Sequence, residues 1–447
     1  MGDVRTAAPA AARALQQWYG ADPYARRAGL YSYRDPALAV RWGDLSQAGR
    51  NVRNSVLALI GQRDRMQVMS RWWNSANAIT ALVDYMAVTG ERSYLGPVVA
   101  NTFARAPGTH RPVYTGLVSS SWPFFRFSRD DYPGFSNGFY DDEGWWALAW
   151  IAAYDLTGDG EYLAAASDIF RDMAGGWDDY WGGGIYWGKR DGQPDRAGAC
   201  AVPSGWKGGY KNAIANELFV AVAAGLGLRY RGRSPDGPDQ ARYLEWARRG
   251  WAWLSSPPPG GVAMINAASL VNDSPNEHGV NDNSQSVWSY NQGVILSGLA
   301  DLAELSGDPA YLGWAEKIAD AFIRNPWRPR AGSAGGPAHP SESGVIDGIL
   351  HEHNDCGPGG CPPARMPSVD STLFKGIFVR HLARLSLKCG KPAYRQFILA
   401  NADSALAHAS EGHLFGANWA APADAADFVR QTAGLDLINA ALRVSQS

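Results

Sequence analysis

The chain has 447 residues, of which 46% are hydrophobic and 12% aromatic, and its formal net charge is -2. It contains no dense run of lysine and arginine, which argues against nucleic acid as a partner. No apolar run reaches the roughly 18 residues that a membrane-spanning helix requires.

Residues 1–20 are rich in alanine and carry Arg5 and Arg13. They lack a basic segment followed by an apolar one, so we expect no signal peptide here. The four cysteines include Cys356 and Cys361, which enclose the segment Gly-Pro-Gly-Gly. A single pair at this spacing is a poor zinc site, but in an oxidising compartment it could close a small disulfide loop; the sequence leaves the bonded and the free states open.

A repeated pattern runs along the chain at intervals of roughly 70–80 residues. Four long apolar runs each end in a glycine shortly before a segment with tyrosine, at Gly90, Gly158, Gly307 and Gly390, and a divergent copy spans 237–244. Glycine just past a helix end is the usual stop, because the backbone turns left-handed there. Each copy therefore predicts a helix, a glycine turn and a second helix.

The two helices of each copy differ in their apolar pattern. The second has one apolar face, formed in the first copy by Leu95, Val98 and Phe103, whereas the first is apolar on nearly all sides, as in 144–154 and 213–228. Helices that are apolar all round lie inside and one-faced helices cover them. We predict inner helices that begin near Trp72, Asp142, Lys211, Tyr290, Phe374 and Thr432, and outer helices that begin near Ala10, Tyr94, Tyr162, Tyr243, Tyr311 and Tyr394.

Six inner helices that alternate with six outer ones predict an all-α fold, an (α/α)6 barrel in which helical hairpins close into a ring. We expect residues 1–447 to form a single catalytic domain. Strand content should be low, and the one candidate for a short β-hairpin is Gly182–Trp187.

In such a ring the inner helices all start at the same end, so their first residues surround one mouth of the barrel. These starts carry aromatic, amide and charged side chains, which we take as candidate substrate contacts: Trp73, Asn74, Lys211, Asn212, Asn216, Tyr290, Gln292, Phe374 and Lys375, with Trp419 ahead of the last helix and Trp187 at the end of the glycine-rich segment. Aromatic rings stack on the apolar faces of sugars, and amides and acids bind their hydroxyl groups. Asn and Asp are also common helix caps, but capping alone is a poor explanation for this chemistry at five of the six starts. Asn212 and Asn216 lie one helical turn apart, which would let both contact one sugar ring.

Segments 141–150, 182–187, 211–219 and 374–378 together resemble glycoside hydrolase family 76. This family contains endo-α-1,6-mannanases, together with fungal cell-wall relatives thought to be transglycosidases. The similarity extends from about Trp72 to Asn439 and implies an (α/α)6 barrel, in agreement with the helix pattern. It also implies a secreted or cell-surface protein.

The resemblance implies retaining cleavage of α-1,6-mannosidic bonds by Asp141 and Asp142, with Asp141 as the nucleophile and Asp142 as the acid/base. A retaining glycosidase needs two carboxyl groups about 5–5.5 Å apart. Neighbouring residues have Cα atoms about 3.8 Å apart, and their side chains can diverge to that range. The start of a helix favours a carboxylate, and a like charge nearby raises the pKa of one member of the pair.

Several other signals have plainer interpretations. A second pair, Asp178 and Asp179, lies in a loop and is interpreted as loop structure. Trp187 is either a stacking platform or a packing residue, and Glu143 either holds Asp142 in place or caps its own helix.

The segment His351-Glu352-His353 suggests a metal at first sight, but the two histidines do not share a helix face, and we interpret it as an exposed loop. Residues 355–367 are rich in glycine and proline and predict a loop over the mouth. The chain has no phosphate loop, dinucleotide fingerprint or nucleophile elbow.

We therefore expect a monomeric enzyme that binds α-1,6-linked mannan or mannooligosaccharides and uses no metal or cofactor. Two alternatives stay open. One is a transglycosidase that passes the mannosyl group from the same aspartate pair to another sugar. The other is a mannan-binding protein without catalytic activity.

Overall fold

The computed structural model describes residues 4–21, 23–32, 72–109, 133–189, 210–231, 240–256, 259–276, 278–284, 286–327, 343–352, 355 and 370–446. Six long helices form an inner layer: α5 (Trp72–Thr89), α7 (Tyr140–Thr157), α9 (Ala213–Arg229), α11 (Ser289–Ser306), α13 (Ser371–Cys389) and α15 (Phe428–Gln446). The outer layer consists of α1 (Val4–Leu15), the turn Leu95–Ala100 that continues into α6 (Asn101–Arg105), α8 (Gly160–Gly175), α10 (Gln240–Ser255), α12 (Ala310–Phe322) and α14 (Pro392–His408). The short helix α2 (Pro23–Ala28) and the 3-10 turns Gln16–Trp18 and Tyr180–Gly182 complete the described helical elements.

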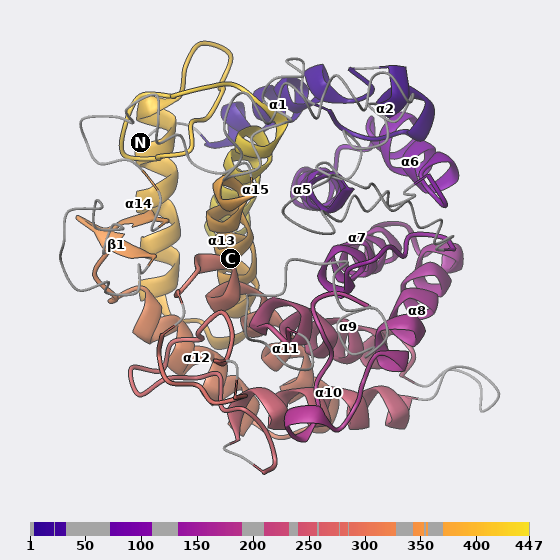
Figure 1. Ribbon diagram of the computed structural model, residues 1–447. Coiled ribbons are helices and arrows are strands. Elements are labelled where there is room, and N and C mark those ends of the chain that lie inside the picture. The colour runs from indigo at the N-terminus through magenta and orange to yellow at the C-terminus, as the bar shows by residue number, and fades with distance from the viewer. Residues whose placement is uncertain are drawn as a thin grey trace, which may run out of the picture.

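The inner helices form a closed ring. Each packs against the next in chain order from α5 to α15, and α15 packs back against α5. Figure 1 shows α8, α10, α12 and α14 at the periphery, and the N-terminal helix α1 beside α15, on which it packs. The predicted (α/α)6 barrel is confirmed, and most predicted helix starts lie within four residues of the observed ones, the first outer helix excepted.

Burial follows the predicted division into inner and outer helices. Every residue of α9 from Ala213 to Gly227 is buried, whereas α8 buries mainly one face, which includes Leu163, Phe170 and Met173. An apolar helix that is covered on all sides removes apolar surface from water around its whole circumference, which is favourable. The inner ring therefore forms the core of the barrel. None of the described helices is both long and apolar enough to cross a membrane.

The predicted glycine stops are confirmed. Gly90, Gly158, Gly307 and Gly390 have φ values of 78°, 74°, 74° and 67°, and each backbone N–H donates to the carbonyl four residues earlier. Glycine adopts this left-handed conformation without the steric cost that a Cβ atom would add.

The β-hairpin lies elsewhere than predicted. The two-stranded sheet of the described residues pairs β1 (Gly344–Ile346) with β2 (Ile349–His351), and Gly344 lies opposite His351. Segment 182–187 instead makes an isolated bridge from Ile185 to Trp177. The reason is local: its three glycines have φ values of 77°, 127° and 83°, which bend the backbone into a turn in place of an extended strand.

Some predicted features lie outside the described residues. Cys356 and Cys361 are among these, and so is most of the predicted loop 355–367. The disulfide and the single-domain organisation stay predictions.

Candidate active site

Asp141 and Asp142 lie in the first turn of α7, and both are partly exposed. The backbone N–H of Asp142 donates to Oδ1 of Asp141 at 3.0 Å, and the indole Nε1–H of Trp187 donates to Oδ2 of Asp141 at 2.9 Å. The amide Nδ2 of Asn137 donates to Oδ2 of Asp142 at 2.6 Å. Each carboxyl group of the pair therefore has its own hydrogen-bond donor, and the two groups are not equivalent.

The two carboxyl groups also differ in proton affinity. Burial raises the pKa of Asp141 to about 7, and the bonds from Trp187 and from the Asp142 N–H partly offset this rise. Burial, and then the negative charge of Asp141, raise the pKa of Asp142 well above its usual value. Because the charge of one carboxylate raises the pKa of the other, the two groups lose their protons in separate steps, and near neutrality at least one of them is protonated.

Trp187 connects the aspartate pair to a second polar group. Its ring meets Tyr210 edge to face, with centroids 5.9 Å apart. The hydroxyl of Tyr210 donates to Oδ2 of Asp273 at 3.0 Å, and Nδ2 of Asn291 donates to Oδ1 at 3.1 Å. Tyr210 precedes α9 and Asn291 lies in α11, so these contacts run from α7 past α9 to α11.

An aromatic cluster lies at the starts of α5, α11 and α13. Phe374 stacks on Tyr290 with centroids 3.8 Å apart and planes at 7°. Trp73 and Trp288 pack against Phe374 at 6.2 and 5.3 Å. Phe374 is buried, whereas Trp73, Trp288 and Tyr290 are partly exposed. The partly exposed rings can stack on a sugar, and Phe374 packs against all three of them.

A third carboxyl group, that of Asp370, belongs to the same end of the barrel. Asp370 directly precedes α13, and its charge contributes to the raised pKa of Asp141 and of Asp142. Its own pKa is raised because the surrounding protein displaces water, an effect that the neighbouring side chains of Trp73 and Asn74 partly offset. Asn74 itself is buried.

The sequence prediction omits Tyr210, Asp273 and Asp370. Two of them carried a usable signal: Asp370 immediately precedes α13 and Tyr210 lies three residues before α9, and functional side chains were expected at these inner-helix starts. Asp273 lies in the long loop before α11, and nothing in its local sequence distinguishes it.

A buried polar residue occupies the fourth position of five inner helices and the fifth position of α13. We call these the fastening residues: Ser75, Glu143, Asn216, Gln292, Lys375 and Gln431. Each is hydrogen-bonded to a chain segment outside its helix. Asn216 accepts from the N–H of Ile185 and donates to its carbonyl, at 2.8 and 2.9 Å, and Gln292 does the same with Val271, at 2.8 and 2.7 Å. The fastening residues thus hold loops against the helix starts.

These contacts argue against several predicted substrate contacts. The polar atoms of Asn216 and Gln292 bind backbone, and Asn212 caps α9 by accepting from the N–H of Ala215 at 3.3 Å. The fully buried amine of Lys211 donates to Asp178 at 2.5 Å and to three backbone carbonyls at 2.7–3.1 Å. Lys211, Asn212, Asn216 and Gln292 therefore stabilise the loops at the mouth.

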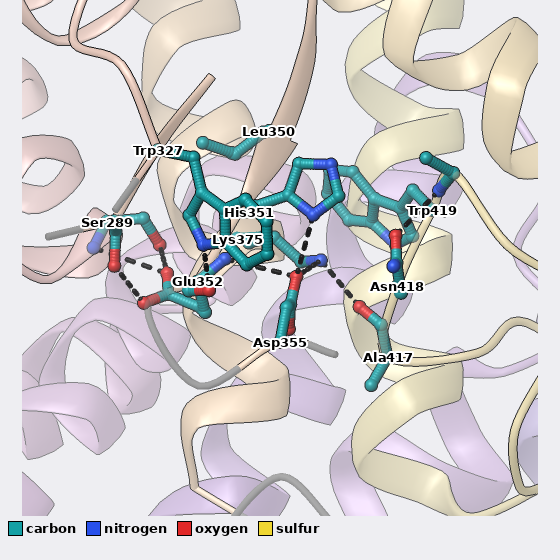
Figure 2. A network of polar contacts seen from close by, with 12 residues as sticks. Ser289, Trp327, Leu350, His351, Glu352, Asp355, Lys375, Ala417, Asn418 and Trp419 are labelled. Carbon is teal, nitrogen blue, oxygen red and sulfur yellow. Dashed lines mark hydrogen bonds and ion pairs between the residues drawn. The ribbon is translucent and has the colours of Figure 1, made fainter. Parts of the chain in front are cut away.

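Lys375 and Trp419 belong to the buried network in Figure 2. Nζ of Lys375 donates to Oδ2 of Asp355 and to the carbonyl of Ala417, both at 2.5 Å, and lies 4.9 Å from the ring centre of Trp419. Trp419 is 1% exposed. Both residues were predicted as substrate contacts, but the structure gives their side chains protein partners.

The prediction of an exposed loop at 351–353 is wrong for its first two residues. His351 ends β2 and is 3% exposed, and Glu352 is fully buried. Glu352 accepts from the N–H and the hydroxyl of Ser289 and from the hydroxyl of Ser343 (Figure 2). Burial lowers the pKa of His351 to about 3 and raises that of Glu352 to about 8, so both stay largely uncharged at neutral pH.

His353 lies outside the described residues. Across the residues that are described, no three His, Cys, Asp or Glu side chains group as ligands for a metal ion. The contacts of the second aspartate pair, Asp178 and Asp179, are consistent with loop structure. Asp178 accepts hydrogen bonds from Lys211 and, at 2.7 Å, from the hydroxyl of Tyr186.

Glu217 is a buried carboxyl group near Asp273, and neither of its oxygens has a hydrogen-bond partner in the described structure. Burial, and then the charge of Asp273, raise its pKa well above the usual value. The unfolded chain releases this proton near pH 4.3, whereas the folded protein retains it to higher pH. Folding therefore loses up to about 1.4 kcal/mol per pH unit as the pH rises from about 4.3 to the folded pKa.

We expect Glu217→Gln to remove this loss. The variant should match the wild type in free energy of unfolding at pH 4 and exceed it increasingly above pH 5. Urea unfolding across this pH range measures the difference, with Glu245→Gln on the outer helix α10 as the control. Equal pH dependence in wild type and Glu217→Gln would contradict the prediction.

Comparison with known proteins places these features in a family. The model of glycosyl hydrolase family 76 matches residues 58–446. A mannan endo-1,6-alpha-mannosidase of Saccharomyces cerevisiae is 24% identical over 78% of this chain, and one of Eremothecium gossypii is 28% identical over 62%. The matches span 66% and 54% of those proteins, so the chain covers slightly less than two thirds of the first and about half of the second.

Two solved structures share the fold over nearly the whole chain. One is an inactive variant of an alpha-1,6-mannanase from Salegentibacter in complex with alpha-1,6-mannotriose, in which two consecutive aspartates are replaced by asparagine. It superposes on this chain with a TM-score of 0.63 at 20% sequence identity, and the match covers 99% of this chain and 100% of that one. The other is a family 76 mannosidase of Bacteroides thetaiotaomicron, with a TM-score of 0.62 at 16% identity and 99% of each chain covered. Because the family model matches most of the sequence, this chain belongs to glycosyl hydrolase family 76.

Proposed function

We propose that this chain is a glycosidase that cleaves α-1,6-mannosidic bonds with retention of configuration, with Asp141 as nucleophile and Asp142 as acid/base. The observation that carries the proposal is the adjacent carboxyl pair at the start of α7, whose two members have separate hydrogen-bond donors and unequal proton affinities. The relatives named as mannan endo-1,6-alpha-mannosidases and the mannotriose complex of the Salegentibacter enzyme support the substrate class.

In the first step a carboxylate oxygen of Asp141 attacks the anomeric carbon, and the bond from this carbon to the leaving oxygen breaks. Asp142 gives its proton to that oxygen, so the leaving sugar departs as a neutral alcohol. The Trp187 indole and the N-terminal end of α7 both favour the charged form of Asp141 before attack. The product of this step is a covalent mannosyl ester on Asp141.

In the second step Asp142, now a carboxylate, takes a proton from water, and the water oxygen attacks the anomeric carbon. The ester bond breaks, Asp141 leaves as a carboxylate, and Asp142 is protonated again. Two inversions at one carbon give net retention. We assign sugar contact to the partly exposed rings of Trp73, Trp187 and Tyr290 and to the carboxyl groups of Asp273 and Asp370.

Digestion of α-1,6-linked mannan tests the substrate and the stereochemistry together. We expect release of mannooligosaccharides whose new reducing end is the α-anomer when proton NMR is recorded before mutarotation, and no release from α-1,2- or α-1,3-linked mannan. A β-anomer would contradict the retaining mechanism. Formation of transfer products at the expense of hydrolysis, when an acceptor sugar is added, would identify a transglycosidase.

The pH dependence of kcat/KM should be bell-shaped. Below its pKa of about 7, Asp141 is protonated and cannot attack, so kcat/KM should rise tenfold per pH unit on the acid side and level off near that pH. At higher pH the rate should fall as Asp142 loses the proton that it must donate. A rate that stays constant from pH 5 to 7 would contradict the assignment of Asp141 as the nucleophile.

A further inference from the structure

Glu143 directly follows the aspartate pair, and the mechanism above gives it no task. It is the fastening residue of α7 and is fully buried. Nζ of Lys189 donates to its Oε2 at 2.9 Å and also to Oδ2 of Asp172 on α8. Burying a carboxylate without a partner is unfavourable, so we expect Glu143 and Lys189 to stay paired in the folded protein.

The other fastening residues indicate what this role is. Asn216 and Gln292 bind both the N–H and the carbonyl of a loop residue, as a neighbouring strand would. The Glu143 side chain has no N–H group, so it binds a donor side chain on the segment that it holds, and the positive charge of that donor partly offsets the rise in the Glu143 pKa that burial causes. Lys189 is this donor, and its second bond ties the same segment to α8.

The segment that Lys189 belongs to is paired with the residues before α7. The N–H of Tyr140 donates to the carbonyl of Trp187, and the N–H of Lys189 donates to the carbonyl of Gly138, both at 3.0 Å. Phe139 and Gly188 form an antiparallel bridge between these bonds. The ion pair thus closes the end of a short ladder, and Trp187, two residues from Lys189, lies within it.

Trp187 is the residue of this ladder that reaches the reacting group, because its indole N–H donates to Oδ2 of Asp141 at 2.9 Å. The ring of Phe139 packs on the indole with centroids 4.8 Å apart, and its own N–H donates to Asn137, the partner of Asp142. A shift of the ladder by a fraction of an ångström would therefore change the hydrogen bond on Asp141.

We infer that Glu143 and Lys189 are positioning residues that hold the 187–189 segment on the start of α7 and so keep the Trp187 indole bonded to Asp141. The kinetic consequences of this inference rest on the proposed function, whereas its structural consequences rest only on the contacts described above. Neither residue touches the substrate, and both act through Trp187.

The titratable groups that interact with Asp141 must stay unchanged in any test. They are Asp370, whose charge raises the pKa of Asp141, and Asp142, Tyr210 and Tyr290, whose pKa values the charge of Asp141 raises. The groups around Lys189 are Glu143, Asp172 and the ring of Tyr140 at 5.2 Å. The informative variants therefore alter only Lys189, Glu143 and Trp187, alone and in combination.

The kinetic test compares Lys189→Met, Trp187→Phe and the double variant. The hydrogen bond from the indole N–H favours the charged form of Asp141. Its loss in Trp187→Phe should therefore shift the acid limb of the kcat/KM profile to higher pH by about one unit. Lys189→Met should move it in the same direction, and the double variant should match Trp187→Phe alone, because one bond cannot be lost twice. Lys189→Arg should restore the wild-type limb, and Lys317→Met on α12 serves as the control.

Two results would overturn the inference: an unmoved acid limb in Lys189→Met, or shifts that add in the double variant. If Lys189→Met folds poorly because Glu143 is left unpaired, Glu143→Gln combined with Lys189→Met removes both charges and should show the same displaced limb. A wild type without activity on α-1,6-mannan would refute the proposed function instead.

A measurement without substrate distinguishes a failure of this inference from a failure of the proposed function. The NMR signal of the Trp187 indole proton, assigned by its absence from Trp187→Phe, should shift with pH as Asp141 titrates. In Lys189→Met this pH-dependent shift should be lost or strongly reduced. If the signal titrates as in the wild type, Lys189 does not position Trp187, whatever the activity of the protein.

Discussion

Asp141→Asn and Asp142→Asn should each remove nearly all activity on α-1,6-linked mannan. Without the Asp141 carboxylate no covalent intermediate can form, and we expect kcat/KM to fall at least about 10⁴-fold. Asp142→Asn removes the proton donor, which should cost about 10²–10⁴-fold. Initial rates of reducing-end release measure both losses.

The two roles can be separated with an aryl mannoside, whose leaving group needs no proton. This substrate should restore much of the rate of the first step in Asp142→Asn and none in Asp141→Asn. The second aspartate pair offers a matched control: Asp179 is exposed in its loop, and Asp179→Asn should retain wild-type activity. If Asp141→Asn kept more than one hundredth of the wild-type rate, the assignment of the nucleophile would have to be abandoned.

Arg380→Met should lower the free energy of unfolding by about 3–5 kcal/mol. Arg380 lies in α13, and its guanidinium bonds both carboxylate oxygens of Asp436 in α15 at 3.2 and 3.3 Å. A third bond, at 2.7 Å, reaches Asn77 in α5, across the closure of the ring. The side chains of Arg380 and Asp436 are 4% and 0% exposed, so the substitution leaves a buried carboxyl group without its cation.

Urea unfolding at neutral pH measures this effect. The double variant Arg380→Met with Asp436→Asn should recover most of the loss, because it also removes the buried carboxyl group that has lost its partner. Arg171→Met provides a matched control, since Arg171 pairs with Asp168 on the surface of α8 with both side chains about 70% exposed, and exposed pairs contribute at most about 1 kcal/mol. A change below about 1 kcal/mol in Arg380→Met would show that the ring closes without this pair.

The sequence alone was enough to predict the barrel. The stops at Gly90, Gly158, Gly307 and Gly390 depend on a local backbone conformation, which the residue type itself favours. The inner helices were identified because their apolar residues surround the helix, as the burial of α9 from Ala213 to Gly227 confirms. Both signals act over a few neighbouring residues, so they can be read without knowledge of the fold. The adjacent carboxyl groups of Asp141 and Asp142 could be found for the same reason.

The tertiary structure alone decided which polar residues at the helix starts bind a loop. Asn216, Gln292 and Lys375 have the residue types of a binding site, yet each is bonded to a segment that arrives from elsewhere in the chain. The same holds for Glu352, which follows β2 and is buried where its carboxyl group accepts hydrogen bonds from Ser289 at the start of α11. A side chain at a helix start points toward whatever packs over it, and that partner is distant in sequence. Helical periodicity fixes the face of a residue on its own helix, but only the folded chain determines which segment covers that face.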